Sequence, residues 1–132
     1  MMTNERVFYK SSLLLVTLFF LTGCQQKLAH PVIAEKEQLD QLSALVAGSS
    51  YLRQYCHRSD IPADPQLLSA ALNQAGQHDW RVSPDTLMEA SQQRFQALTQ
   101  DKVSPEMRCA ALNGAMAPFV EQARQVSMAS SA

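Results

Sequence analysis

Residues 39–57 have the sequence LDQLSALVAGSSYLRQYCH, and this stretch decides the fold of the 132-residue chain. Its apolar and small residues recur at steps of three and four, which is the spacing of one face of an α-helix. On a helical wheel they fill an arc of roughly 240°, whereas a surface helix needs an apolar stripe only somewhat wider than ~100°. We therefore expect this helix either to lie at the centre of a helical domain or to line a groove. The arc is broken by Gln41 and Arg53, and its residues are Tyr51, Ala44, Tyr55, Gly48, Leu52, Leu45, Cys56, Ser49, Leu42, Val46 and Leu39.

Three later segments begin with a short polar residue followed by proline, a combination typical of the start of a helix. Asp64-Pro65 opens a helix that stops at Gly76, Ser83-Pro84 opens another, and Ser104-Pro105 opens a last one that runs to about Arg124. Each segment carries an apolar face with helical spacing, and no stretch shows the alternation of a β-strand. The sequence therefore predicts an all-α fold, a compact four-helix domain.

The N-terminal part of the chain has the layout of a secretory signal. Arg6 and Lys10 precede a short apolar run that ends in small residues and Cys24. The run is shorter than the ~20 apolar residues that span a bilayer, so we predict a signal peptide. Leu21-Thr22-Gly23-Cys24 resembles the lipobox of bacterial lipoproteins, in which the cysteine is lipid-modified and becomes the first residue of the mature chain. The alternatives are an ordinary signal peptide with an incidental cysteine and an uncleaved anchor.

These features divide the chain into four predicted segments. Residues 1–23 form the lipoprotein signal peptide, and residues 24–34 form the acylated N-terminus and a flexible tether. The four-helix domain occupies residues 35–126, which is enough for a single hydrophobic core. Residues 127–132 have no apolar stripe and are predicted to fray.

The chain has three cysteines. Lipidation of Cys24 leaves Cys56 and Cys109, an even pair in an exported and oxidising compartment. We predict one intramolecular disulfide between them, which closes a loop of about 54 residues and stabilises the fold by roughly 4 kcal/mol. The alternative is two free thiols or two metal ligands. Because no third and fourth ligand stands at zinc-like spacing, no metal site is predicted.

The composition favours a binding protein over an enzyme. The formal net charge is −1 without a basic run, so nucleic acid is not expected as a partner. No serine-nucleophile elbow, glycine-rich phosphate loop or metal-ligand spacing is present, and His57 points about 100° away from Cys56 on a helix. We expect no catalytic residue and no cofactor other than the lipid on Cys24. The helix at residues 39–57 has more apolar surface than one neighbouring layer can cover, and the predicted disulfide would hold the domain in shape. Together these features suit a groove that receives a partner's helix.

Several spaced anchors resemble one family. Behind the lipobox come Leu42-x-x-Leu45-Val46-Ala47-Gly48, Tyr51-Leu52-Arg53-x-x-Cys56-x-Arg58-Ser59-Asp60-Ile61-Pro62, Cys109-x-x-Leu112-Asn113 and Ala117-Pro118-Phe119. Between about Leu39 and Arg124 the chain resembles the type II secretion pilotins of the PulS/OutS kind. The resemblance implies a four-helix, disulfide-bonded lipoprotein that binds the C-terminal region of the secretin, the channel subunit. It also implies delivery to the periplasmic face of the outer membrane by the lipoprotein sorting machinery.

The resemblance also implies roles for single residues. Gln25 follows the lipidated cysteine, where aspartate would typically retain a lipoprotein in the inner membrane, so outer-membrane delivery is expected. The wheel and the family's peptide-binding role together predict a groove, and core packing is the alternative for each of its residues. The predicted lining is Leu42, Leu45, Val46, Ser49 and Leu52, with Leu98 or Phe119 as walls.

Two other functions are left open by the residues alone. One is an outer-membrane lipoprotein that serves as a structural or regulatory cofactor of a periplasmic cell-wall enzyme. The other is a small periplasmic enzyme with an unrecognised site. Loss of a pilotin would mislocalise or degrade a secretin, whereas loss of the first alternative would alter the integrity of the cell wall.

Overall fold

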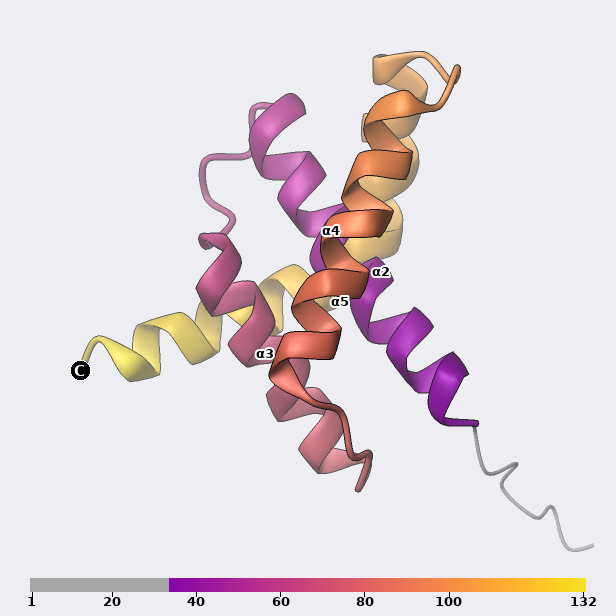
Figure 1. Cartoon of the computed structure of the whole chain (residues 1–132). Helices are drawn as coiled ribbons and strands as arrows, with labels where there is room; N and C mark the ends of the chain where they lie inside the picture. The colour runs from indigo at the N-terminus through magenta and orange to yellow at the C-terminus, as the bar shows by residue number, and fades with distance from the viewer. Residues whose placement is uncertain (1–33) are drawn as a thin grey trace, which may run out of the picture. The chain divides into compact units, whose positions relative to one another are not determined.

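The structure is a computed structural model that describes residues 34–132. It contains the helices α2 (Glu35–Tyr55), α3 (Asp64–Gln77), α4 (Pro84–Gln100) and α5 (Pro105–Ser130), and no strand occurs in this part of the chain (Figure 1). The predicted all-α, four-helix fold is confirmed. None of the helices within these residues is long and apolar enough to cross a membrane. The predicted signal peptide and most of the tether, with Cys24 and Gln25, lie outside the described residues.

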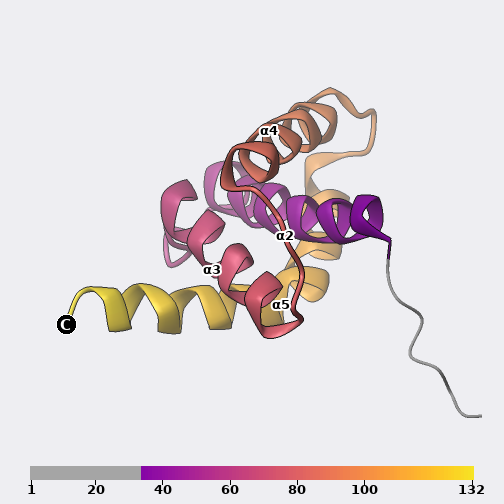
Figure 2. The same ribbon diagram turned by 60° about the horizontal axis from the view of Figure 1, so that its bottom comes forward.

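Helix α2 is the central element of the domain. It contacts each of the other three helices, and Figure 2 shows it between α4 and α5. This position accounts for the broad apolar arc of α2, because three neighbours cover different parts of it. The buried core cluster consists of Leu42, Val46, Leu52, Ile61, Leu67, Ala70, Ala71, Ala75, Leu87, Met116, Phe119, Val120 and Ala123.

Helix α5 crosses α2 closely at Gly48. A Cβ atom at this position would lie 2.8 Å from the sulfur of Met116 and 3.3 Å from Cδ2 of Leu112. Glycine inside a helix costs about 1 kcal/mol relative to alanine. The close approach of the two α5 side chains explains why a residue without a side chain occurs in the middle of α2.

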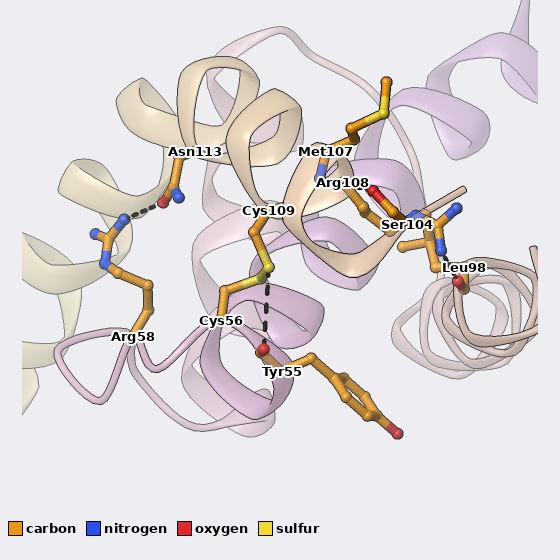
Figure 3. The surroundings of a disulfide bond; sticks show 9 residues. All are labelled: Tyr55, Cys56, Arg58, Leu98, Ser104, Met107, Arg108, Cys109 and Asn113. Atoms are coloured by element: carbon orange, nitrogen blue, oxygen red, sulfur yellow. Dashed lines mark hydrogen bonds between the residues drawn. A yellow bond between two sulfur atoms is a disulfide. The ribbon is translucent and has the colours of Figure 1, made fainter. Parts of the chain in front are cut away.

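The predicted disulfide between Cys56 and Cys109 is present, with a sulfur–sulfur distance of 2.03 Å and a Cα–Cα distance of 5.7 Å (Figure 3). The Cα separation lies in the usual range for disulfides. The bond joins the residue that follows α2 to the early part of α5. Next to it, Arg58 donates a hydrogen bond to the side-chain oxygen of Asn113, so two links connect the end of α2 to α5.

The C-terminal end of the domain differs from the sequence prediction. Helix α5 continues to Ser130, so the expected domain end at residue 126 and the expected frayed tail at 127–132 need correction. The bonds of an α-helix join residues four apart, so a segment can continue a helix without an apolar stripe of its own. The last turns of α5 extend beyond the other helices in both views (Figures 1 and 2).

Candidate functional site

Helix α4 packs on α2 with few buried side chains. Of its 17 residues, the buried ones are Leu87 and Ser91. A cleft therefore opens on each flank of α4, one towards α5 and one towards α3. We call them the α5-side cleft and the α3-side cleft.

The α5-side cleft has a volume of about 270 Å³ and a floor of small residues. Ala44, Ala47 and Gly48 of α2 are spaced by three and four residues, so they lie on one flank of that helix. The distance between packed helices depends on the side chains at their contact, so the methyl groups of Ala44 and Ala47 permit a close approach, whereas the space beside Gly48 is filled by Met116 and Leu112. The remaining lining residues are Arg94, Ala97, Leu98 and Asp101 around α4, and Leu112 and Met116 of α5.

The two charged residues that line the α5-side cleft are both ion-paired. Arg94 lies 3.0 Å from a carboxylate oxygen of Asp40, and Asp101 lies 2.8 Å from the guanidinium of Arg108. Paired charges present a weaker net field to a ligand than single charges do. The interior of the cleft is therefore apolar, with polar groups at its margin.

The α3-side cleft is larger, about 330 Å³, but more polar. The side chain of Gln54 donates a hydrogen bond of 2.9 Å to Ser50, and Ser91 donates one of 2.6 Å to the carbonyl oxygen of Leu87. The glutamine amides leave polar groups that an apolar ligand could not satisfy. Its lining consists of Val46, Ala47, Ser50, Gln54, Asp64, Pro65, Leu68, Met88, Ser91, Gln92, Phe95 and Gln96.

The groove predicted from the helical wheel needs correction. Leu42, Ser49 and Leu52 are 0% exposed and Phe119 is 3% exposed, and these four residues line neither of the two clefts. The physical reason is the central position of α2, whose apolar arc is covered by the domain's own helices. Leu45 is half-buried and packs against the core cluster.

Two predicted groove residues do lie at clefts, on opposite flanks of α4. Leu98 lines the α5-side cleft, and Val46 contributes to the wall of the α3-side cleft although it is 3% exposed. The small floor residues Ala44, Ala47 and Gly48 were missed. Their spacing of three and four residues is the signal that could have identified them, but the prediction gave weight to large apolar side chains.

The described residues offer no evident site for chemistry. Within residues 34–132 there is no group of three or more His, Cys, Asp or Glu side chains that could hold a metal ion. The one carboxyl group with a strongly shifted pKa is Asp60, among the described residues. Its pKa falls to about 2 because Arg58 donates hydrogen bonds of 2.8 and 2.9 Å to its two oxygens. Asp60 is well exposed and lines neither cleft.

Residues 21–121 match the family described as type II secretion system pilotin lipoproteins, PulS_OutS. The chain belongs to this family. The pilotin is 33% identical over 114 residues to the pullulanase secretion protein PulS of Klebsiella pneumoniae, covering 83% of this chain and 91% of the relative. It is 37% identical over 95 residues to the pilotin OutS of Dickeya dadantii (strain 3937), covering 71% of each chain. The family predicted from the sequence is confirmed.

Solved structures resemble the pilotin over most of the described domain. A chain of the type II secretion system outer membrane complex of Klebsiella pneumoniae, which contains PulD, PulS and the PulC HR domain, matches with a TM-score of 0.67 and 36% identity. That match covers 69% of the pilotin and 99% of the other chain. A chain of a pilotin/secretin peptide complex matches with a TM-score of 0.65 and 38% identity, over 67% of the pilotin and 95% of that chain.

Proposed function

We propose that this pilotin binds the C-terminal segment of a type II secretion secretin and targets it to the outer membrane, where the channel assembles. The observation that carries the proposal is family membership together with the 38% identity to a chain in a pilotin/secretin peptide complex. The protein acts by binding, without catalysis and without a cofactor other than the lipid on Cys24. The lipid and Gln25 direct it through the lipoprotein sorting machinery to the periplasmic face of the outer membrane.

The secretin segment binds in the α5-side cleft as an amphipathic helix. Ala44 and Ala47 on the floor carry only a methyl group each and so admit a helix closely, and the apolar walls formed by Leu98, Leu112 and Met116 match an apolar helix face. Recognition of this kind depends on anchor side chains spaced by three and four residues. The α3-side cleft is larger but less suitable, because its glutamine side chains would lose hydrogen bonds to water beneath an apolar partner.

Two neighbouring residues of α4 allow the clefts to be tested separately. Ala97 lines the α5-side cleft and Gln96 lines the α3-side cleft, and both are exposed, so a large side chain at either position spares the core. We expect Ala97→Trp to weaken binding of a secretin C-terminal peptide by tenfold or more, because an indole fills the cleft, as judged by titration calorimetry. Gln96→Trp is the matched control and should change the affinity less than twofold. Circular dichroism verifies that both variants fold.

The opposite result would relocate the site. If Gln96→Trp weakens binding and Ala97→Trp does not, the α3-side cleft receives the secretin. If neither change affects the affinity, the segment binds elsewhere on the domain and the cleft assignment is wrong.

Transport is tested separately from binding. In cells, Cys24→Ala should leave peptide binding by the helical domain intact but remove the pilotin and its secretin from the outer-membrane fraction. This result is expected because several acyl chains provide the durable membrane attachment, at ~0.8 kcal/mol per buried methylene. Normal outer-membrane secretin in the Cys24→Ala strain would contradict the proposed transport role.

A further inference from the structure

One wall of the α5-side cleft is held by a buried cation. The side chain of Arg108 is 7% exposed, although arginine is rarely buried unless it is paired. Its guanidinium donates a hydrogen bond to the carbonyl oxygen of Leu98, lies 2.8 Å from a carboxylate oxygen of Asp101, and stands 5.6 Å from the centre of the Tyr51 ring. Figure 3 shows Arg108 reaching from α5 to Leu98 near the end of α4. One side chain thus connects three separate parts of the domain.

The positive charge of Arg108 is electrostatically favourable for the C-terminal end of α4, but not for the N-terminal end of its own helix α5. A cation in the first turn of α5 stands at the end of the helix dipole that disfavours positive charge. At α4 the situation is reversed. The last carbonyl groups of a helix lack intrahelical partners, and positive charge is favourable there. Arg108 therefore supplies the donor that the carbonyl of Leu98 would otherwise lack.

Two of the groups that Arg108 holds belong to residues that line the α5-side cleft, namely Leu98 and Asp101. Helix α4 has few buried side chains of its own, so its C-terminal end depends on such links. We propose that Arg108 is a positioning residue for secretin binding, which fixes Leu98 and Asp101 at the spacing that admits an apolar helix between α4 and α5. The inference rests on the proposed function, since it concerns the same cleft.

A double-mutant cycle between Arg108 and Leu98 tests the proposal. Arg108→Met, which keeps much of the side-chain volume, should weaken binding of the secretin C-terminal peptide by about five- to tenfold. Most of the change should appear as faster dissociation of the peptide, measured by surface plasmon resonance on folded, oxidised protein. In a Leu98→Ala background the same change should have less than a twofold effect, because the wall that Arg108 positions has already been removed.

Two further variants complete the design. Arg108→Lys should restore part of the affinity, since an ammonium can still bond to a carbonyl or a carboxylate but not in the planar, forked geometry of a guanidinium. Arg124→Met is the matched control, because Arg124 lies on the same helix, is 46% exposed and lines neither cleft. It should bind the peptide within twofold of the wild type.

Each outcome decides for or against the role of Arg108. An unchanged peptide affinity in Arg108→Met, with a lower free energy of unfolding in urea, would show a purely structural residue and overturn the inference. Equal effects of Arg108→Met with and without Leu98→Ala would overturn it too. If Ala97→Trp and Leu98→Ala leave binding intact, the assigned cleft fails and the inference falls with it. Should Arg108→Met not fold, Arg108→Lys and Asp101→Asn carry the same cycle.

Discussion

Helices α5 and α4 both pack on α2, but they are attached to it in different ways. Helix α5 is joined covalently through Cys109, crosses closely at Gly48, and buries several apolar side chains. Helix α4 buries Leu87 and Ser91, and its C-terminal end is held by Arg108. The α2–α5 pair therefore forms a covalently joined scaffold, and α4 forms a wall with a cleft on each flank.

This difference between α5 and α4 suggests how a small domain can bind a partner helix while its own core stays folded. Ordering of flexible groups at an interface subtracts from affinity, so a scaffold that is already fixed preserves most of the interaction energy. The cleft between α4 and α5 supplies the apolar surface that the scaffold itself has used for its core. The stability that comes from the α2–α5 pair can be measured separately from the stability that comes from α4.

The largest expected effect is loss of the disulfide. Replacement of both Cys56 and Cys109 by serine should lower the free energy of unfolding by roughly 4 kcal/mol, because the 53-residue separation of the pair makes the unfolded chain gain much loop entropy. Urea denaturation followed by circular dichroism measures the change, and reduction of the wild type is the control. The fraction that remains folded should bind the secretin peptide within twofold. A large loss of affinity in that fraction would mean that the scaffold and the cleft are not separable.

The next effect concerns the attachment of α4. Leu87 is 0% exposed, so Leu87→Ala should lower the free energy of unfolding by about 3 kcal/mol through the cavity that it leaves. Its neighbour Met88 is 44% exposed, and Met88→Ala should change stability by less than ~0.5 kcal/mol. Thermal and urea unfolding of the two variants provide the comparison. Equal values for the two would show that Leu87 is not an anchor of α4.

A smaller effect is expected inside the scaffold, at Ser49. Its hydroxyl is fully buried and has no hydrogen-bond partner within residues 34–132, so Ser49→Ala should leave the free energy of unfolding unchanged or raise it by up to ~1 kcal/mol. Ser43 is the matched control on the same helix. It is also fully buried, but it donates a hydrogen bond of 3.2 Å to the carbonyl oxygen of Asp40, so Ser43→Ala should be the less stable variant. The reverse order in urea denaturation would contradict the assignment.

The four-helix fold could be predicted from the sequence because helix starts and apolar faces are recognisable within short stretches of the chain. The apolar arc of residues 39–57, the three polar-residue-and-proline starts, and the pairing of Cys56 with Cys109 together predict four helices and their staple. The end of α5 was missed because the last turns have no apolar stripe to announce them. Helical turns that do not pack on the core need no apolar stripe, so a search for apolar spacing does not detect them.

The site was predicted less well, for a physical reason. A helical wheel identifies which residues are apolar but not which neighbour covers them, so Leu42 and Leu52 were placed in a groove although they fill the core. Arg108 could not have been found at all. It binds a backbone carbonyl ten residues away and faces Tyr51, and neither partner leaves a trace in sequence spacing.

The smallest effect concerns the surface pair that lies beside the scaffold. Hydrogen bonds from Arg58 lower the pKa of Asp60 from its ordinary value of 3.8 to about 2. A carboxyl whose pKa is lower in the folded than in the unfolded state contributes stability that is fully present above the unfolded pKa. That contribution is lost as the pH falls from about 4 through about 2. Because Asp60 is 42% exposed, the pair is screened by solvent and should contribute less than ~1 kcal/mol.

Asp60→Asn should therefore be slightly less stable than the wild type at pH 7, and the difference should shrink as the pH falls from 4 to 2, since protonation of the wild-type carboxyl removes the same charge. Urea denaturation at pH 7, 4 and 2 measures this convergence. Peptide affinity at pH 7 should not change, because Asp60 lines neither cleft. A difference in stability that persists at pH 2 would mean that Asp60 acts through packing rather than through its charge. A loss of affinity at pH 7 would extend the binding surface from the wall formed by α4 to the scaffold itself.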